Sequence, residues 1–179
     1  FLTASAHKFH GPKGIGFLYV SSMDFDSYLH GGDQEQKKRA GTENLAAIVG
    51  MVAALKEDLE KQEEHFQHVQ NLETAFLTEL EEVQYYLNRG DHHLPYVLNI
   101  GFPGQKNDLL LLRLDLAGIS ISTGSACTAG IVQSSHVLEA MYGANSERLK
   151  ESVRISLSPE NTVEDLHTLA KTLKEIIGG

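Results

Sequence analysis

A lysine stands directly before a glycine-rich turn in the stretch "SAHKFHGPKGIG", residues 5–16. A lysine amine at the end of a strand can attack an aldehyde and form a Schiff base with an aldehyde cofactor. If the strand continues to His7, alternation puts Ser5 and His7 on one face beside Lys8, where both could donate hydrogen bonds to a phosphate. The pattern also fits a solvated lysine at a strand end. A nucleotide-binding glycine loop is a further alternative, but it lacks the Ser or Thr that follows a Walker lysine.

The one cysteine of the chain, Cys127, lies in "STGSACTAG", a stretch built almost entirely of small residues. Such a loop exposes its sulfur and moves readily, which suits a thiolate nucleophile that must reach a substrate. The alternative is a cysteine that packs as a small, inert hydrophobic residue, although such cysteines usually lie in apolar helices or strands. A single cysteine makes no disulfide within the chain, which excludes a disulfide-stapled secreted scaffold.

Two further side chains could bind anionic groups. Arg154 is the only charged residue of the alternating segment "SVRISLS", and its planar guanidinium fits a substrate carboxylate, with a structural ion pair as the alternative. Thr42, in "RAGTEN", is expected to begin a helix whose free backbone N–H groups suit an anion, unless it only caps the helix. The nine histidines show no metal-ligand spacing, so no metal is predicted, and His65 and His68 are expected to be solvated.

The composition is that of an ordinary globular protein, with 41% apolar and 22% charged residues. The formal net charge of -9 and the lack of a long basic run argue against nucleic-acid binding. No apolar run approaches the roughly 20 residues of a membrane helix, and no signal peptide is evident, so we expect no membrane contact and a cytoplasmic location. Because the strand-like pattern starts at Phe1, we interpret the chain as a fragment of a longer protein.

Strand and helix patterns alternate along the chain. We expect strands at 1–7 and 15–20, the second one buried, joined by the glycine turn as a hairpin or as two adjacent strands of a sheet. Helical spacing of apolar residues fills 45–83, as one long or bent helix or as two helices in series. The other expected elements are a strand at 96–102, a helix at 107–118, a short strand at 119–122, a helix at 135–143, a strand at 152–158 and a helix at 162–177.

The helix expected at 162–177 has the clearest signals of the chain. Asn161 and Glu164 have the spacing of a capping box. Its predicted buried stripe consists of Val163, Leu166, Leu169, Leu173 and Ile176. Further upstream, a shift from apolar to charged composition near residues 56–62 indicates a domain boundary, which we place between 1–58 and 59–179. The mixture of strands and helices predicts an α/β or α+β fold.

Five motifs occur in one order along the chain: "SAHKFHGPKGIGFLYV", "HGGDQEQKKRAGTENLAAIVGMVAAL", "STGSACTAG", "SHVLEAMYG" and "VRISLS". In this order and spacing the chain resembles the C-terminal half of the cysteine desulfurases of the NifS/IscS type, class-V aminotransferases that use pyridoxal 5'-phosphate. The resemblance implies an α/β fold in which residues 1–58 are the C-terminal part of an aspartate-aminotransferase-like cofactor-binding large domain. Residues 59–179 would form a small α+β C-terminal domain with a mobile cysteine loop.

The resemblance also implies roles for single residues. Lys8 matches the lysine that carries the cofactor, and Ser5 and His7 match residues that hold its phosphate. Thr42 matches a threonine that reaches the cofactor phosphate of the partner subunit, which implies a homodimer. Arg154 matches the arginine that grips the carboxylate of the substrate.

Cys127 matches the nucleophile that takes sulfur from L-cysteine. This step leaves L-alanine and an enzyme persulfide, whose sulfur passes to a sulfur-acceptor protein for iron–sulfur cluster assembly or tRNA thiolation. In this family, residues that stack on the cofactor ring lie upstream of the part that the chain matches, so the chain alone is expected to be inactive. A selenocysteine lyase and a non-catalytic interaction fragment are the alternatives.

Overall fold

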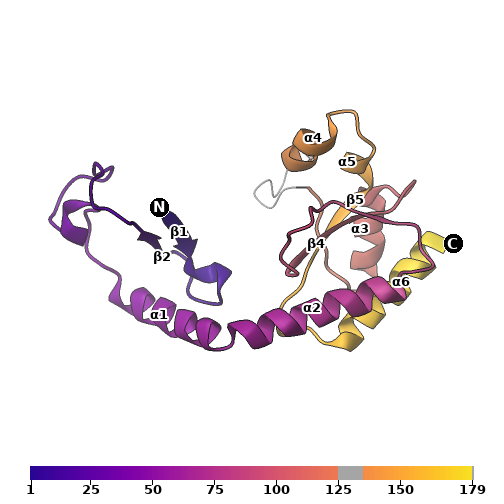
Figure 1. The fold of residues 1–179 in the computed structure, drawn as a ribbon, viewed down its shortest axis with the longest axis horizontal. Helices are drawn as coiled ribbons and strands as arrows, with labels where there is room; N and C mark the ends of the chain where they lie inside the picture. Colours follow the sequence, from indigo (N-terminus) through magenta and orange to yellow (C-terminus); the bar gives the residue numbers. More distant parts are fainter. Residues whose placement is uncertain (125–134, 179) are drawn as a thin grey trace. The chain divides into compact units, whose positions relative to one another are not determined.

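The chain divides into two compact units, Phe1–Gln62 and Glu63–Gly179. The computed structural model describes residues 1–124 and 135–178 (Figure 1). The division falls where helix α1 (Leu45–Glu60) gives way to helix α2 (Gln62–Glu79). The helical region expected at 45–83 therefore consists of two helices in series, which is one of the two predicted arrangements.

The first unit begins with a two-stranded antiparallel hairpin. Strands β1 (Leu2–Ser5) and β2 (Gly16–Tyr19) pair with Ser5 opposite Gly16, so the hairpin is the one of the two predicted arrangements that the structure shows. The prediction that the second strand is buried is wrong, since Leu18 is 48% and Tyr19 62% exposed. The reason is that β2 pairs only with β1 within the described residues, so the hairpin lacks a second layer to cover it.

β1 ends at Ser5, so the prediction of a strand through His7 is also wrong. A 3-10 turn, η1 (Ala6–Lys8), follows it. The carbonyl of Ala6 accepts the backbone N–H groups of Phe9 and Gly11, at 3.0 and 2.8 Å. These two bonds fold the chain back on itself, because they use a carbonyl that a continuing strand would have offered to its neighbour.

Helix α1 is capped by Asn44, whose side-chain oxygen accepts the N–H of Ala47 at 3.2 Å. The predicted helix start at Thr42 is therefore wrong, since the capping geometry belongs to Asn44. α1 packs closely on the glycine-rich turn of the hairpin. A Cβ at Gly50 would lie 2.8 Å from Cγ of Pro12, so only a glycine lets the helix approach the turn this far.

The second unit contains a three-stranded antiparallel sheet in the order β3-β4-β5. Its strands are β3 (Tyr86–Leu87), β4 (Val97–Gly101) and β5 (Ser152–Ser156). β4 and β5 confirm two predicted strands in shortened form. β3 was not predicted, because two residues are too few to show an alternating pattern. In the register of β4 and β5, Leu98 lies opposite Ile155.

One face of this sheet carries the hydrophobic core. It packs against helices α2, α3 (Asn107–Leu116) and α6 (Val163–Gly178), and α6 runs beside α2 (Figure 1). The fully buried large side chains are Phe76, Phe102, Leu72, Leu80, Leu98, Ile100, Leu110, Leu114, Leu173, Val69 and Val153. Burial of each such side chain contributes about 1.5–3 kcal/mol, so this core dominates the stability of the second unit.

Polar contacts join α2 to α6 at the edge of the core. His68 Nε2 donates to the carbonyl of Asn161 at 2.9 Å, and His167 Nδ1 lies 2.9 Å from Oε1 of Glu79. The expectation that His65 and His68 are solvated is wrong, since both rings are half-buried. The apolar side chains that flank them on α2 face the core, and this draws the two rings toward it.

The start of α6 lies one residue later than the capping signal predicted. Thr162 and Asp165 form the capping box: the Thr162 N–H donates to Asp165 Oδ2 at 2.9 Å, and the Asp165 N–H donates to Thr162 Oγ1 at 3.2 Å. The prediction for Asn161 and Glu164 is therefore wrong. The predicted buried stripe is confirmed at Leu166, Leu169, Leu173 and Ile176, whereas Val163 is 57% exposed because it opens the first turn.

Helices α3 and α4 (His136–Tyr142) confirm the two helices expected at 107–118 and 135–143. Helix α5 (Arg148–Glu151) is a single turn that was not predicted. The short strand expected at 119–122 is reduced to one antiparallel bridge, between Ser122 and Arg154.

Candidate functional site

The first part of the site is the turn that presents Lys8. Ala6 is fully buried, and its N–H donates to the carbonyl of Ile15 at 3.0 Å. This anchor fixes the turn, while the neighbouring side chains of Ser5, His7 and Lys8 are exposed. The structure thus brings these three predicted residues together at the end of β1, although a 3-10 turn rather than a strand positions them.

The turn is supported from behind by close packing. A Cβ at Gly11 would lie 2.9 Å from the Cβ of Ala6, so a glycine is required for the chain to pass there. The rings of Phe9 and Phe17 pack with their centroids 6.5 Å apart. Since Pro12 in the same turn contacts α1, the backbone beneath Lys8 is held by both the hairpin and the helix.

The charged residues that neighbour Lys8 in the sequence are of one sign. Residues 1–23 contain no Asp or Glu, whereas the turn carries His7, Lys8, His10 and Lys13. An anion placed against this segment therefore meets amine and imidazole groups with no carboxylate nearby in the sequence. The donor set of an amine, two imidazoles and a hydroxyl fits a ligand that has both an aldehyde and a phosphate.

Thr42 lies in the same unit but is not joined to this turn by a hydrogen bond in the part of the chain that the structure describes. Its side chain is exposed, two positions before the cap of α1 at Asn44. Thr42 therefore neither lies in the helix nor caps it, and its side chain is exposed.

The second part of the site lies on β5. Arg154 is half-buried, and β4 and Ser122 flank it on the two sides, with Asn99 opposite it on β4. Its N–H donates to the Ser122 carbonyl at 2.7 Å, and the Ser122 N–H donates back to the Arg154 carbonyl at 3.1 Å. Within residues 1–124 and 135–178 no carboxylate pairs with its guanidinium, so the alternative of a structural ion pair is not seen there.

A partly buried polar network lies beside β5, and nothing in the sequence indicated it. The guanidinium of Arg148 stacks between the rings of Tyr86 and Tyr142, at 4.1 and 4.4 Å from their centroids. It also donates to Oδ1 of the buried Asn88 at 2.8 Å, and Asn88 in turn donates to Ser152 Oγ at 2.8 Å. The network fastens α4 and α5 to the face of the sheet opposite the core.

Tyr86 is the titratable group that this network perturbs. Burial raises the pKa of its phenol above the ordinary value of 10.0. A hydrogen bond to Glu151 Oε2, at 3.1 Å, acts in the same direction, while a bond to Ser152 opposes it. The phenol therefore stays protonated and serves as a donor that ties β3 to α5.

Cys127 lies outside the described residues. The chain is described up to Gly124 on one side and from Ser135 on the other. Ser135 is buried and caps α4, its Oγ accepting the N–H of Leu138 at 3.3 Å. Both ends of the intervening segment therefore start from well-bonded elements, the Ser122 bridge and the first turn of α4.

Within residues 1–124 and 135–178, no cluster of His, Cys, Asp and Glu side chains has the form of a metal site. No described helix combines the length and the apolar character needed to cross a bilayer.

Comparison with known proteins identifies the family to which the chain belongs. The family model for class-V aminotransferases matches residues 1–169. The chain belongs to the class-V aminotransferase family. The matched range contains the Lys8 turn, Thr42 and Arg154 of this class-V aminotransferase chain, so all the described candidate residues lie inside it.

Two curated relatives of this class-V aminotransferase carry the words cysteine desulfurase IscS in their names. The relative from Bacillus subtilis (strain 168) is 46% identical and covers 98% of the chain and 48% of its own length. The relative from Dictyoglomus turgidum is 38% identical over 98% of the chain and 45% of its own length. The chain therefore spans about half the length of the curated relatives it matches.

Solved structures agree with this assignment. A NifS-like protein superimposes on 98% of the class-V aminotransferase chain and on 45% of its own, with a TM-score of 0.84 and 32% identity. The NifS-like protein from Rickettsia africae gives a TM-score of 0.80 at 28% identity, over 99% of the chain and 47% of its own. The predicted family resemblance and the predicted α/β fold class are thus confirmed.

Proposed function

We propose that the chain is part of a cysteine desulfurase and supplies its cofactor-bearing lysine, its substrate-binding arginine and its sulfur-accepting cysteine. The observation that carries the proposal is the turn at Ala6–Lys8, which exposes an amine close in the chain to an exposed hydroxyl and an exposed imidazole, on a backbone held from behind. The names of the relatives support the reaction, and the matched family supports the cofactor.

The residues present fit pyridoxal 5'-phosphate. Lys8 offers an amine for its aldehyde, and Ser5 and His7 offer donors for its phosphate in a segment without carboxylates. When bound, this cofactor acts as a sink for the electrons released at the α-carbon of an amino acid. In this proposal the amine of Lys8 would also take and return the proton at that carbon.

Thr42 completes the phosphate site from a second copy of the chain in this proposal. Its exposed hydroxyl and its lack of a bond to its own Lys8 turn support such a role. The active protein would then be a homodimer in which each subunit lends Thr42 to the other. We place it in the cytoplasm, as for the family that the sequence resembles.

Arg154 binds the carboxylate of L-cysteine in this proposal, because its guanidinium has no carboxylate partner in the described residues and can make two parallel hydrogen bonds. The Cys127 sulfur then forms a bond to the substrate sulfur while the carbon–sulfur bond of the substrate breaks. Carbon keeps the bonding electrons and gains a proton, which gives L-alanine. The enzyme keeps the sulfur as a persulfide, to be passed to an acceptor protein.

We propose residues 1–58 as the end of the cofactor-binding large domain and residues 59–179 as the small domain. The division of the chain after Gln62 supports a boundary in this region. The junction between helices α1 and α2 is compatible with this boundary.

The experiment that tests this function uses the full-length protein that contains the chain, loaded with pyridoxal 5'-phosphate. Incubation with L-cysteine should give L-alanine, and mass analysis of the protein should find one added sulfur on Cys127. The variant Cys127→Ser should take up no sulfur. Uptake that persists in this variant, or protein that releases no L-alanine, would refute the proposal.

A further inference from the structure

The loop between β2 and α1 holds a run of backbone that side chains normally avoid. Glu35, Gln36 and Lys37 all have positive φ, at 49°, 55° and 64°. For residues other than glycine such angles are uncommon singly and rarer still in succession, because Cβ crowds the backbone. Strain of this kind persists only where surrounding bonds hold it, and it concentrates at functional sites. The hydrogen bonds that hold this loop therefore indicate which functional residue its backbone positions.

Backbone and side-chain bonds close the base of the loop. The Ala40 N–H donates to the Leu29 carbonyl at 3.1 Å, and Ser27 Oγ donates to the Lys38 carbonyl at 3.1 Å. The ammonium of Lys38 donates to the Phe25 carbonyl at 2.5 Å and lies over the Phe25 ring. The outgoing and the returning segment of the loop are thus bonded to each other before the chain reaches Thr42.

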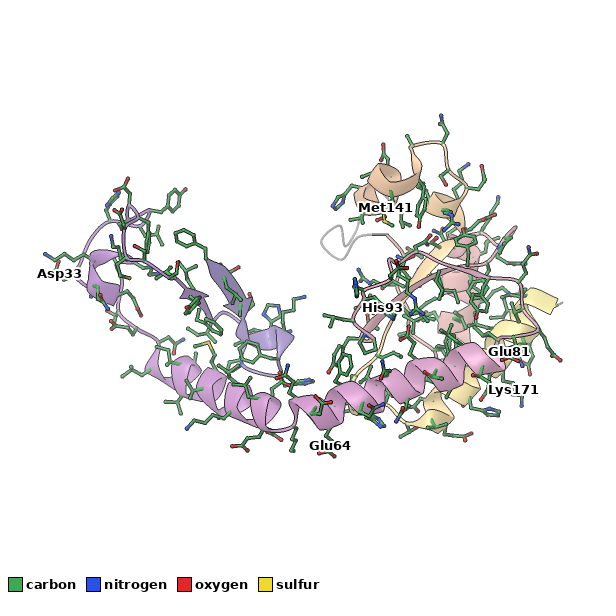
Figure 2. The ribbon with its side chains drawn as sticks, in the orientation of Figure 1. Asp33, Glu64, Glu81, His93, Met141 and Lys171 are labelled. Carbon is green, nitrogen blue, oxygen red and sulfur yellow. The ribbon has the colours of Figure 1, made fainter. Side chains whose placement is uncertain are left out.

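Gln34, which precedes the strained run, is hydrogen-bonded to Gly41, which follows the run. The residue is half-buried, and its Oε1 accepts the N–H of Gly41 at 3.1 Å. Its amide also lies over Gly32, where an added Cβ would collide with Oε1. Gly41 has a φ of +114°, which favours glycine, so the acceptor and the two glycines form one unit. Asp33, next to Gln34, is labelled in Figure 2.

We propose that Gln34 is a positioning residue for Thr42. Its side chain holds the N–H of Gly41 and so sets the backbone from which the Thr42 hydroxyl projects. The inference rests on the proposed function, in which Thr42 binds the cofactor phosphate. It adds a residue that touches neither substrate nor cofactor and acts on phosphate binding through its neighbour.

The first test needs no cofactor. Hydrogen exchange of the full-length protein should show the Gly41 amide exchanging about threefold to tenfold faster in Gln34→Ala, the effect of losing one ordinary hydrogen bond. Gln34→Glu keeps an acceptor oxygen and should restore most of the protection. Gln36→Ala, in the same loop, is the matched control and should leave Gly41 unchanged. Unchanged exchange in Gln34→Ala would overturn the proposal.

The second test separates phosphate binding from general damage. Gln34→Ala should weaken binding of pyridoxal 5'-phosphate about threefold to tenfold and leave the binding of pyridoxal, which has no phosphate, unchanged. Equal loss for both ligands, or no loss for either, would overturn the inference. In combination with Thr42→Ala the two losses should be less than additive, since both remove the same phosphate contact.

The same titrations distinguish this inference from the proposed function. If Thr42→Ala shows the phosphate-specific loss and Gln34→Ala does not, the role of Gln34 fails while that of Thr42 stands. If Thr42→Ala shows no phosphate-specific loss, the role of Thr42 in the proposed function fails, and the inference fails with it.

Discussion

Arg154 and Ser122 exchange two backbone hydrogen bonds, at 2.7 and 3.1 Å, and so make the segment before Cys127 a neighbour of β5. The hydroxyl of Ser122 adds a third contact to the Arg154 carbonyl at 3.3 Å. The residue proposed to hold the substrate carboxylate and the chain leading to the proposed nucleophile therefore share one edge of one sheet.

Replacing Arg154 by Lys in the full-length protein should raise the KM for L-cysteine about 10- to 100-fold, with a smaller change in kcat. A charge-assisted bidentate pair contributes about 1.5–3 kcal/mol, and an ammonium does not reproduce its geometry. Steady-state kinetics measure the effect. Arg113→Lys is the control, because that guanidinium donates to the Ile176 carbonyl at 3.1 Å and should not affect KM. An unchanged KM in Arg154→Lys would contradict the assignment.

Alkaline pH should destabilise the protein through Tyr86. Burial raises the pKa of this phenol above 10.0. A raised pKa in the folded state stabilises the fold below the unfolded pKa, and the contribution is lost as the pH rises through the folded pKa. Urea unfolding at rising pH should therefore show a steeper loss of stability above about pH 10 in the wild type than in Tyr86→Phe. Tyr28→Phe, at a ring 91% exposed, should follow the wild type. Parallel curves for wild type and Tyr86→Phe would argue against the buried phenol.

Acid should act on the start of α6 through Asp165. The N–H of Thr162 donates to this carboxylate and lowers its pKa below 3.8. A lowered pKa in the folded state stabilises the fold above the unfolded pKa, and the contribution is lost as the pH falls through the folded pKa. Asp165→Asn should therefore be less stable than wild type at neutral pH, and the difference should shrink below about pH 4.

Glu164→Gln is the matched control for the capping box, because Glu164 is the residue that the spacing in the sequence favoured. Circular dichroism of thermal unfolding at neutral and acid pH compares the two variants. If Glu164→Gln rather than Asp165→Asn lowers the stability, the cap lies at Asn161 and the structure of the turn is wrong.

Helix α3 offers a comparison of burial within one element. Leu114 is fully buried and Leu116 is 80% exposed. Leu114→Ala should lower the free energy of unfolding by about 2–5 kcal/mol, since it removes buried methyl groups and leaves a cavity. Leu116→Ala should change it by less than about 0.5 kcal/mol. Urea unfolding measures both changes. Equal effects of the two substitutions would contradict the observed orientation of α3, in which Leu114 faces the core and Leu116 faces solvent.

Long, periodic elements of this fold could be predicted from the sequence, and contacts between distant residues could not. The stripe from Leu166 to Ile176 repeats with the helical period, so its burial was predictable. The cap was misplaced because Asn161 and Thr162 are both good caps and both have an acidic residue three positions on, and local geometry alone selects Thr162. The Arg148 stack draws on Tyr86 and Tyr142, and nothing in the local sequence of either tyrosine indicates it.

The candidate site shows the same limit. The role of Lys8 rests on its residue type beside the glycine turn and stays a prediction. The strand expected around it does not form, because the Ala6 carbonyl bonds to Phe9 and Gly11 instead. Gln34 was missed because a glutamine in a polar loop carries no periodic signal. Its role depends on the folded path of the chain between Gly32 and Gly41.

Lys8 is the residue proposed to carry the cofactor, and a chemical label can identify that residue. The full-length protein is incubated with pyridoxal 5'-phosphate, reduced with borohydride so that any lysine–cofactor bond becomes permanent, digested and mapped by mass spectrometry. We expect a cofactor adduct on Lys8 that is lost in Lys8→Ala and retained in Lys13→Ala, the exposed lysine of the same turn. An adduct on Lys13 or another lysine in the unaltered protein, with Lys8 unlabelled, would contradict the proposed role of Lys8.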